Sequence, residues 1–135
     1  MAKIEISGTG EGELDQFQVQ ATFLKLQNSY LLLVSDQPEF GIGTVTLSAP
    51  PSGISSEASS SPFNIFGMKN NILANLIGRN ASKSLKVPVL SLVLIKESTL
   101  KPEQRMKVIM QAVTKAINEV EETQKQEQNE KQEQE

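Results

Sequence analysis

The chain has 135 residues, contains no Cys and no His, and carries 13 basic against 16 acidic side chains, for a net charge of −3. Without these residue types the chain cannot form a disulfide framework, a thiolate nucleophile, a Ser-His-Asp triad or an imidazole general base. The usual zinc ligands are missing as well, although the acidic side chains leave a carboxylate or metal enzyme formally open.

The small net charge hides a segregation along the chain. Residues 1–66 carry two bases and seven acids, residues 67–120 carry nine bases and three acids, and residues 121–135 carry two bases and six acids. Such blocks usually form solvated faces, and the alternative is a partner site that uses charge to steer association.

Two patterns in the first half predict a β-hairpin. A short strand at Lys3–Ile6 is followed by a glycine-rich stretch, residues 7–13, which we interpret as a flexible turn. Apolar and polar residues then alternate over Phe17–Phe23, and Tyr30–Val34 is wholly apolar. Period-two alternation indicates a strand with one buried face, so the two runs predict a hairpin.

The middle of the chain is predicted from turn signals and β-branched residues. Gly41-Ile42-Gly43 predicts a turn or bulge before a strand at Thr44–Leu47. Residues 49–62 are rich in Ser and Pro, which predicts a mobile loop. Phe63–Gly67 then forms a short strand or a docking turn. Ile72, Leu73, Leu76 and Ile77 recur at helical spacing, which predicts a first helix over Lys69–Ser84.

The last third predicts one central strand and one long helix. Val87–Ile95 is apolar on both faces, as expected for a strand covered on both sides. An apolar stripe that includes Met106 and Met110 predicts an amphipathic helix over Pro102–Glu122. Residues 123–135 are wholly polar, so we expect a folded domain at 1–122 and a disordered or frayed tail, although a solvated helical extension fits its composition.

The element order, strands first and helices later, indicates an α+β domain of five to six strands. Two helices cover only one face of such a sheet, yet Tyr30–Val34 and Val87–Ile95 are apolar on both faces. An apolar face without a helix implies a partner, and the simplest one is a second sheet in a dimer. The longest apolar runs are far shorter than the roughly 20 residues of a membrane helix, and no signal segment is apparent, so we expect a cytoplasmic protein.

The remaining motifs favour binding rather than catalysis. Gly8-Thr9-Gly10-Glu11-Gly12 resembles a phosphate loop only superficially, because acids lie within it and no helix with a Lys follows. Asp36 and Glu39 could bind a hard cation, although a solvated loop is the simpler interpretation. Four bases gather around the first helix, Lys69, Arg79, Lys83 and Lys86. No aromatic residues are interleaved with them for base stacking, so an acidic protein surface fits them better than nucleic acid does.

These features together resemble the proteasome assembly chaperone 3/4 family. The resemblance lies in Phe63-Asn64-Ile65-Phe66-Gly67, the helical Leu73-Ala74-Asn75-Leu76-Ile77, the strand from Val87-Pro88-Val89 to Leu94 and the amphipathic helix after it. The hairpin from Phe17 to Val34 has the same character, and the match covers roughly residues 15–120.

The resemblance implies an antiparallel sheet with two helices on one face and dimerisation, as homodimer or heterodimer, through the other face. It also implies a non-enzymatic chaperone without a cofactor, which binds proteasome α-subunits and assists assembly of the α-ring of the 20S core particle. The expected α-subunit contacts are the four basic residues. Two alternatives remain open, a roadblock-like dimeric adaptor and a small-ligand binder with residues 49–62 as a lid. Because roadblock-like domains open with a helix, the strand expected at the N-terminus favours the chaperone.

Overall fold

The computed structural model describes residues 4–51, 59–64, 71–96 and 100–133. The elements in these ranges are, in chain order, β1 (Glu5–Leu14), β2 (Phe17–Lys25), β3 (Tyr30–Ser35), β4 (Thr44–Ala49), β5 (Ser59–Asn64), α1 (Asn71–Leu85), β6 (Val89–Leu94) and α2 (Pro102–Glu133). None of the described helices combines the length and the apolar character that a membrane span requires.

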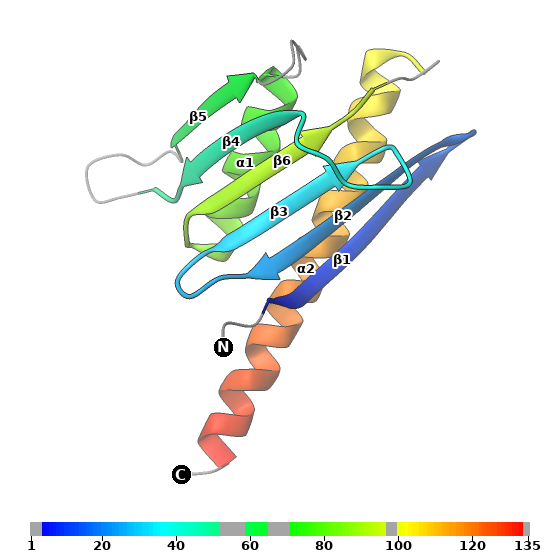
Figure 1. The fold of residues 1–135 in the computed structure, drawn as a ribbon. Coiled ribbons are helices and arrows are strands. Elements are labelled where there is room, and N and C mark those ends of the chain that lie inside the picture. The colour runs from blue at the N-terminus through cyan, green and yellow to red at the C-terminus, as the bar shows by residue number, and fades with distance from the viewer. Residues whose placement is uncertain (1–3, 52–58, 65–70, 97–99, 134–135) are drawn as a thin grey trace.

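The strands form one sheet in the order β1-β2-β3-β6-β4-β5, with both helices on the same side (Figure 1). The predicted α+β fold with two helices on one face is therefore confirmed. The expectation of a wholly antiparallel sheet is wrong, because β3 and β6 run parallel while the other neighbouring pairs are antiparallel. α1 lies on the covered face and connects β5 to β6. This crossover connection allows β6 to run parallel to its neighbour β3.

The strongest strand patterns are confirmed. β2 and β3 form the predicted hairpin, with Lys25 opposite Tyr30 and Ala21 opposite Val34. β6 lies between β3 and β4, the central position predicted from its two apolar faces. The loop predicted over residues 49–62 is wrong in part. Ser59–Asn64 forms β5 and pairs with β4, since a backbone ladder does not depend on apolar side chains.

The glycine-rich stretch is not a turn but the middle of β1. Gly8, Gly10 and Gly12 alternate along the strand and are buried beneath α2. A Cβ atom at Gly8 would lie 2.6 Å from the carbonyl oxygen of Ala116, and one at Gly10 would meet the carbonyl oxygen of Ala112. The turn prediction fails because these glycines allow a helix backbone to approach a strand, whereas the φ of 58° at Gly43 does fit the predicted turn.

The hydrophobic core fills the space between the sheet and the two helices. Its fully buried residues include Val19, Phe23 and Leu32 from the strands and Ile109 and Val113 from α2. The ring of Phe23 packs edge-on against Tyr30, with 5.9 Å between ring centroids. As predicted, Met106 and Met110 pack against this core.

Beneath α1 the covered face is lined with hydroxyl groups. Thr44, Thr46 and Ser48 of β4 and Ser91 of β6 are fully buried there. Within the described residues, the hydroxyl oxygens of Thr46, Ser48 and Ser91 have no hydrogen-bond partner. A Cβ atom at Gly78 of α1 would meet the hydroxyl of Ser48, so the helix lies close to these groups.

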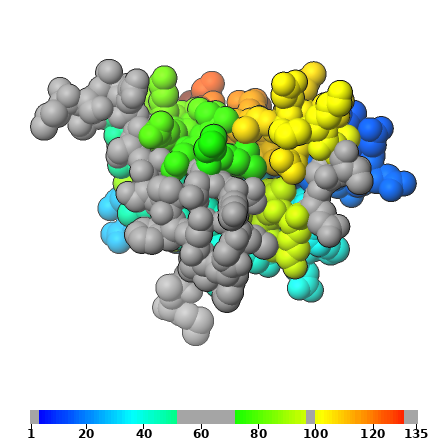
Figure 2. Space-filling model, turned by 90° about the horizontal axis from the view of Figure 1, so that it is seen from above, coloured from blue at the N-terminus to red at the C-terminus, as the bar shows by residue number. Residues whose placement is uncertain are grey.

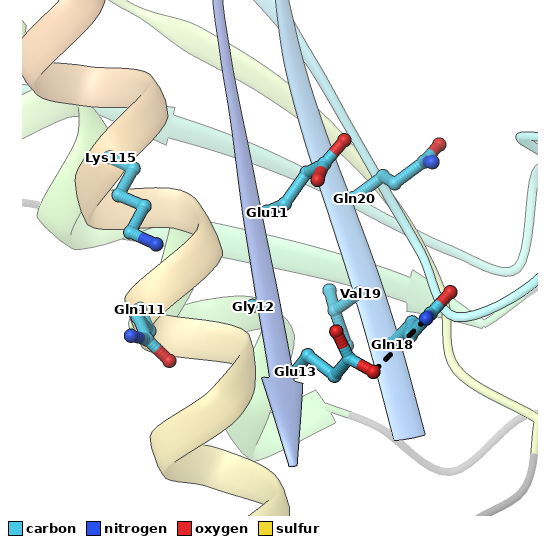
Figure 3. Close-up of a pocket in the computed structure, with 8 residues that line it drawn as sticks. All are labelled: Glu11, Gly12, Glu13, Gln18, Val19, Gln20, Gln111 and Lys115. Atoms are coloured by element: carbon cyan, nitrogen blue, oxygen red, sulfur yellow. Dashed lines mark hydrogen bonds between the residues drawn. The ribbon is translucent and has the colours of Figure 1, made fainter. Parts of the chain in front are cut away.

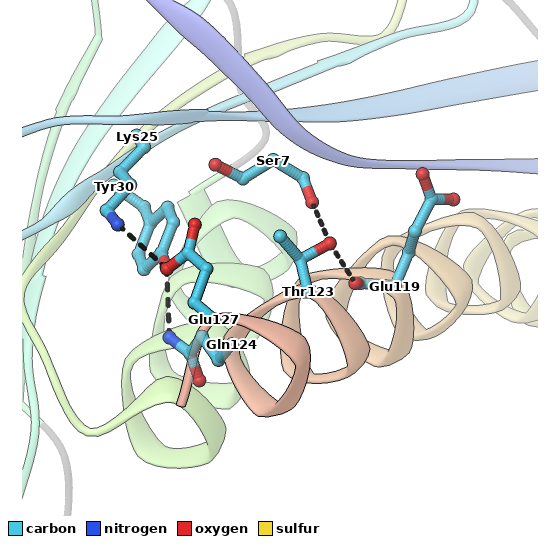
Figure 4. A network of polar contacts seen from close by, with 7 residues as sticks. All are labelled: Ser7, Lys25, Tyr30, Glu119, Thr123, Gln124 and Glu127. Atoms are coloured by element: carbon cyan, nitrogen blue, oxygen red, sulfur yellow. Dashed lines mark hydrogen bonds and ion pairs between the residues drawn. The ribbon is translucent and has the colours of Figure 1, made fainter. Parts of the chain in front are cut away.

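α2 continues to Glu133, well beyond the predicted end at Glu122. The Thr123 hydroxyl donates to the Ser7 carbonyl oxygen at 3.3 Å, and Gln124 Nε2 donates to the Tyr30 hydroxyl at 2.9 Å. Lys25 Nζ lies 3.3 Å from a carboxylate oxygen of Glu127 (Figure 4). The chain is helical through Glu133, and these three polar contacts connect the first part of the extension, as far as Glu127, to β1, β2 and β3. The division into a domain at 1–122 and a tail stays a prediction.

Candidate interaction surfaces

The face of the sheet that carries no helix is rich in leucine. Successive strand residues point to opposite faces, so burial of Leu32 beneath the helices places Leu31 and Leu33 on the other side. The same alternation in β6 places Leu90, Leu92 and Leu94 on that side. These side chains are half-buried, whereas their neighbours on the covered face are fully buried.

The strand register joins these residues into one continuous surface. One row crosses the sheet as Ile6, Leu24, Leu31, Leu90 and Leu47. The next row is Thr22, Leu33, Leu92 and Val45. We call the apolar members of both rows the leucine band: Ile6, Leu24, Leu31, Leu33, Val45, Leu47, Leu90 and Leu92. It runs from β1 to β4 across the face that Figure 1 presents to the viewer, and its outer members Ile6 and Leu47 are 66% and 55% exposed.

The band gives way to polar residues toward one end of β1 and β2. Glu11 pairs with Gln20 and Glu13 with Gln18, whose Nε2 donates to the Glu13 carboxylate at 3.2 Å. A hollow of about 400 Å³ lies around this part of β1 and also reaches Gln111 and Lys115 of α2. Figure 3 shows Lys115 on one side of β1 and Glu11 on the other, so the charged groups do not converge on one point.

The loop after β3 is ordered by hydrogen bonds at the other polar border of the band. The Ser35 hydroxyl donates to the Glu39 carbonyl oxygen at 3.0 Å and accepts the Gln37 N–H at 3.0 Å. The Asp36 carboxylate accepts the backbone N–H of Lys96 at 3.1 Å. Asp36 thus helps to connect two strand ends, and the described residues contain no group of three acidic side chains arranged to hold a metal ion.

Of the four predicted basic residues, Arg79 and Lys83 lie on α1, which packs on the face of the sheet opposite the leucine band. Arg79 and Lys83 are exposed and stand one turn apart on α1. Lys86 follows the helix with a φ of 60°, and its N–H donates to the Ser82 carbonyl oxygen at 2.8 Å. Lys69 lies outside the described residues. Seen from above in Figure 2, the green atoms of α1 and the yellow atoms at the start of α2 lie on one side, and cyan atoms of the β3 region lie on the other.

The sequence pattern missed two exposed apolar residues on α1. Ile72 and Leu76 belong to the apolar pattern that predicted the helix, but they are 82% and 38% exposed. The buried face consists of the other two residues of that pattern, Leu73 and Ile77, together with Ala74, Ala81 and Leu85. The predicted helix is present, and its buried face includes small residues because the sheet approaches closely there. The two alanines are seven residues apart with Gly78 between them, and this spacing is the feature of the sequence that could have indicated a closely packed helix face.

No family model and no curated protein sequence matches this chain. Its fold, however, matches a chain of the crystal structure of a chaperone complex for yeast 20S proteasome assembly. The TM-score is 0.59 at 10% sequence identity, and the match covers 89% of this chain and 97% of the yeast chain. The two chains therefore share a fold over nearly their whole lengths.

Proposed function

We propose that this chain is a cytoplasmic, non-enzymatic chaperone that binds proteasome α-subunits as a dimer and assists assembly of the α-ring of the 20S core particle. The observation that carries the proposal is the near full-length likeness to a chain of the yeast assembly chaperone complex. The leucine band and the exposed bases of α1 support it, because an apolar face and a basic face on opposite sides of the sheet suit two separate protein contacts.

In this proposal the leucine band is the dimer interface. A second sheet packed face to face about 10 Å away would remove the half-buried leucines from water. Each Å² of apolar surface buried in this way contributes about 25 cal/mol. The second sheet comes from another copy of the chain or from a related chain of the same fold.

The α-subunit is then bound on the helix side, by Lys69, Arg79, Lys83 and Lys86. Because α1 lies on the other side of the sheet from the band, a dimer joined through the band leaves α1 of each protomer accessible. Exposed charges increase the association rate more than they increase the affinity. Such a contact suits a chaperone that must release the subunit once the ring has formed.

The test is capture of individual α-subunits by the tagged full-length chain after co-expression. We expect capture of at least one subunit and weaker capture by Lys83→Glu/Lys86→Glu, with an unchanged melting temperature. Lys101→Glu/Lys107→Glu, which reverses two exposed charges of the α2 region, is the matched control and should capture normally. Unchanged capture by the first variant would remove those two lysines from the site. Recovery of a GTPase instead of α-subunits would contradict the proposal and favour the roadblock-like adaptor.

A further inference from the structure

The outer face of α1 carries a stripe that combines apolar and basic residues. Ile72, Leu76, Arg79 and Lys83 are spaced at i, i+4, i+7 and i+11, which places them in one line along a helix. All four are exposed, and Ile72 is the most exposed large apolar residue in the described part of the chain. We call these four residues the α1 stripe.

The position of the stripe follows from the helical period. At 100° per residue, the fully buried Ala74, Ala81 and Gly78 cluster on one side of α1, and the stripe is centred on the opposite side. The stripe therefore points away from the sheet. It is about 16 Å long and one residue wide, at 1.5 Å of rise per residue, so it fits a second helix better than a flat surface.

A second copy of the chain fits the stripe poorly. Two α1 helices packed in parallel would place Arg79 and Lys83 against the same bases of the other copy. Packed antiparallel, they would place these bases against Ile72 and Leu76. The other exposed helical segment, α2 beyond Val120, is acidic but has no apolar residue in its described part, so it cannot cover Ile72 and Leu76.

We propose that the α1 stripe is the docking site for an amphipathic helix of another protein. This partner helix carries apolar residues opposite Ile72 and Leu76 and acidic residues opposite Arg79 and Lys83. Apolar contact supplies affinity and the paired charges set the register, as in other complexes in which a helix packs on a helical surface. The inference rests on the proposed function only in taking α1 as the partner-binding side, and it adds the chemistry of the partner.

The direct test uses designed helical peptides and the full-length chain. The acidic peptide carries Leu at i and i+4 and Glu at i+7 and i+11 on an Ala/Gln background, and a control peptide carries Lys in place of Glu. Both are also made in the reverse order, since the partner can lie parallel or antiparallel to α1. Fluorescence anisotropy at low salt should show that an acidic peptide binds at least about tenfold more tightly than its Lys counterpart.

Two variants of the chain sharpen the test. Ile72→Ser/Leu76→Ser should weaken acidic-peptide binding about tenfold, whereas Leu14→Ser/Leu26→Ser, at 38% and 41% exposure, is the matched control and should not. Arg79→Glu/Lys83→Glu should reverse the preference, so that the Lys peptide binds more tightly. Absence of binding, equal binding of the two peptides, or no reversal would overturn the inference.

The same variants separate this inference from the proposed function. If Ile72→Ser/Leu76→Ser captures α-subunits as well as the unaltered chain does, the stripe is not their docking site, and the proposed function still stands. If the peptides behave as expected but no α-subunit is captured, the docking chemistry stands and the proposed function fails.

Discussion

Neighbouring residues of one strand point to opposite faces of the sheet and differ in burial, as Leu32 and Leu33 of β3 illustrate. Leu32 is 0% exposed beneath the helices, whereas Leu33 is half-buried in the leucine band. The covered face is complete within one chain, since two helices close it. The open face carries similar leucines without a covering layer in this chain, which is why we propose that a partner sheet covers it.

The covered face is itself divided between its two helices. α2 meets β1 backbone to backbone at the three glycines, over an apolar core. α1 covers the buried hydroxyls of β4 and β6, three of which lack partners within the described residues. α2 therefore closes over an apolar core, whereas α1 closes over buried hydroxyl groups.

The largest expected effect comes from truncating the two neighbouring leucines of β3. Leu32→Ala should lower the free energy of unfolding by about 2–5 kcal/mol at every protein concentration, because it opens a cavity in the core. Leu33→Ala should lower the free energy of unfolding by less. This loss should become smaller on dilution, because in the proposed dimer the second chain buries part of the Leu33 side chain. Urea unfolding at two protein concentrations measures both. If both variants lost the same free energy of unfolding at both protein concentrations, the two faces would not differ in the way proposed.

The glycine contact with α2 predicts the next largest effect. Gly10→Ala should destabilise the chain by about 1–3 kcal/mol, because the added methyl group meets the Ala112 backbone and α2 must shift. Thr9→Ala, on the other face of the same strand, should change the free energy of unfolding by less than about 0.5 kcal/mol. Thermal or urea unfolding compares the two variants. A neutral Gly10→Ala would mean that α2 does not lie against β1.

The hydroxyl groups beneath α1 predict an effect of the opposite sign. Ser91→Ala removes a buried hydroxyl that has no partner within the described residues, so stability should stay constant or rise by up to about 1 kcal/mol. Urea unfolding of this variant measures whether the free energy of unfolding rises or falls. A loss of more than about 1 kcal/mol would show that the hydroxyl is hydrogen-bonded, for example through water.

The polar extension of α2 predicts the smallest effect. Lys25→Met breaks the ion pair with Glu127, whose two side chains are 43% and 48% exposed. Solvent-exposed pairs of this kind contribute less than about 1 kcal/mol, and we expect a loss below about 0.5 kcal/mol. Hydrogen exchange across α2 should show faster exchange beyond Val120 in the variant. A global loss of stability would instead make the extension part of the folding unit.

The sequence was most informative where side-chain period alone determines structure. The alternation of Val19, Ala21 and Phe23 predicted β2 and its buried face, and the apolar run after Pro88 predicted a central strand. The uncovered apolar face could also be predicted, because two helices cannot cover both sides of the sheet. Whether that face pairs with another sheet stays a prediction.

Predictions from the sequence were weakest where small residues allow close packing. Glycines in β1 indicated a turn, but they make room for α2, and alanines in α1 were given less weight than Ile72 and Leu76. Lys83 and Arg79 were selected from charge alone, and the structure places them on one line with the two missed apolar residues. The helical extension of α2 fits the composition of its residues, but its side-chain hydrogen bonds to β1 and β3 leave no periodic signal in the sequence.

The central claim is that the open face closes against a second sheet, and the molar mass in solution tests it most directly. Size-exclusion chromatography with light scattering at micromolar concentration should give the unaltered chain, expressed alone or with its related partner chain, the mass of a dimer. Leu33→Asp/Leu92→Asp should give the 14.8 kDa of one chain with its secondary structure intact, and Leu14→Asp, outside the leucine band, should remain dimeric. A monomeric unaltered chain that gains no partner chain, or a dimer that survives both aspartates, would contradict the account.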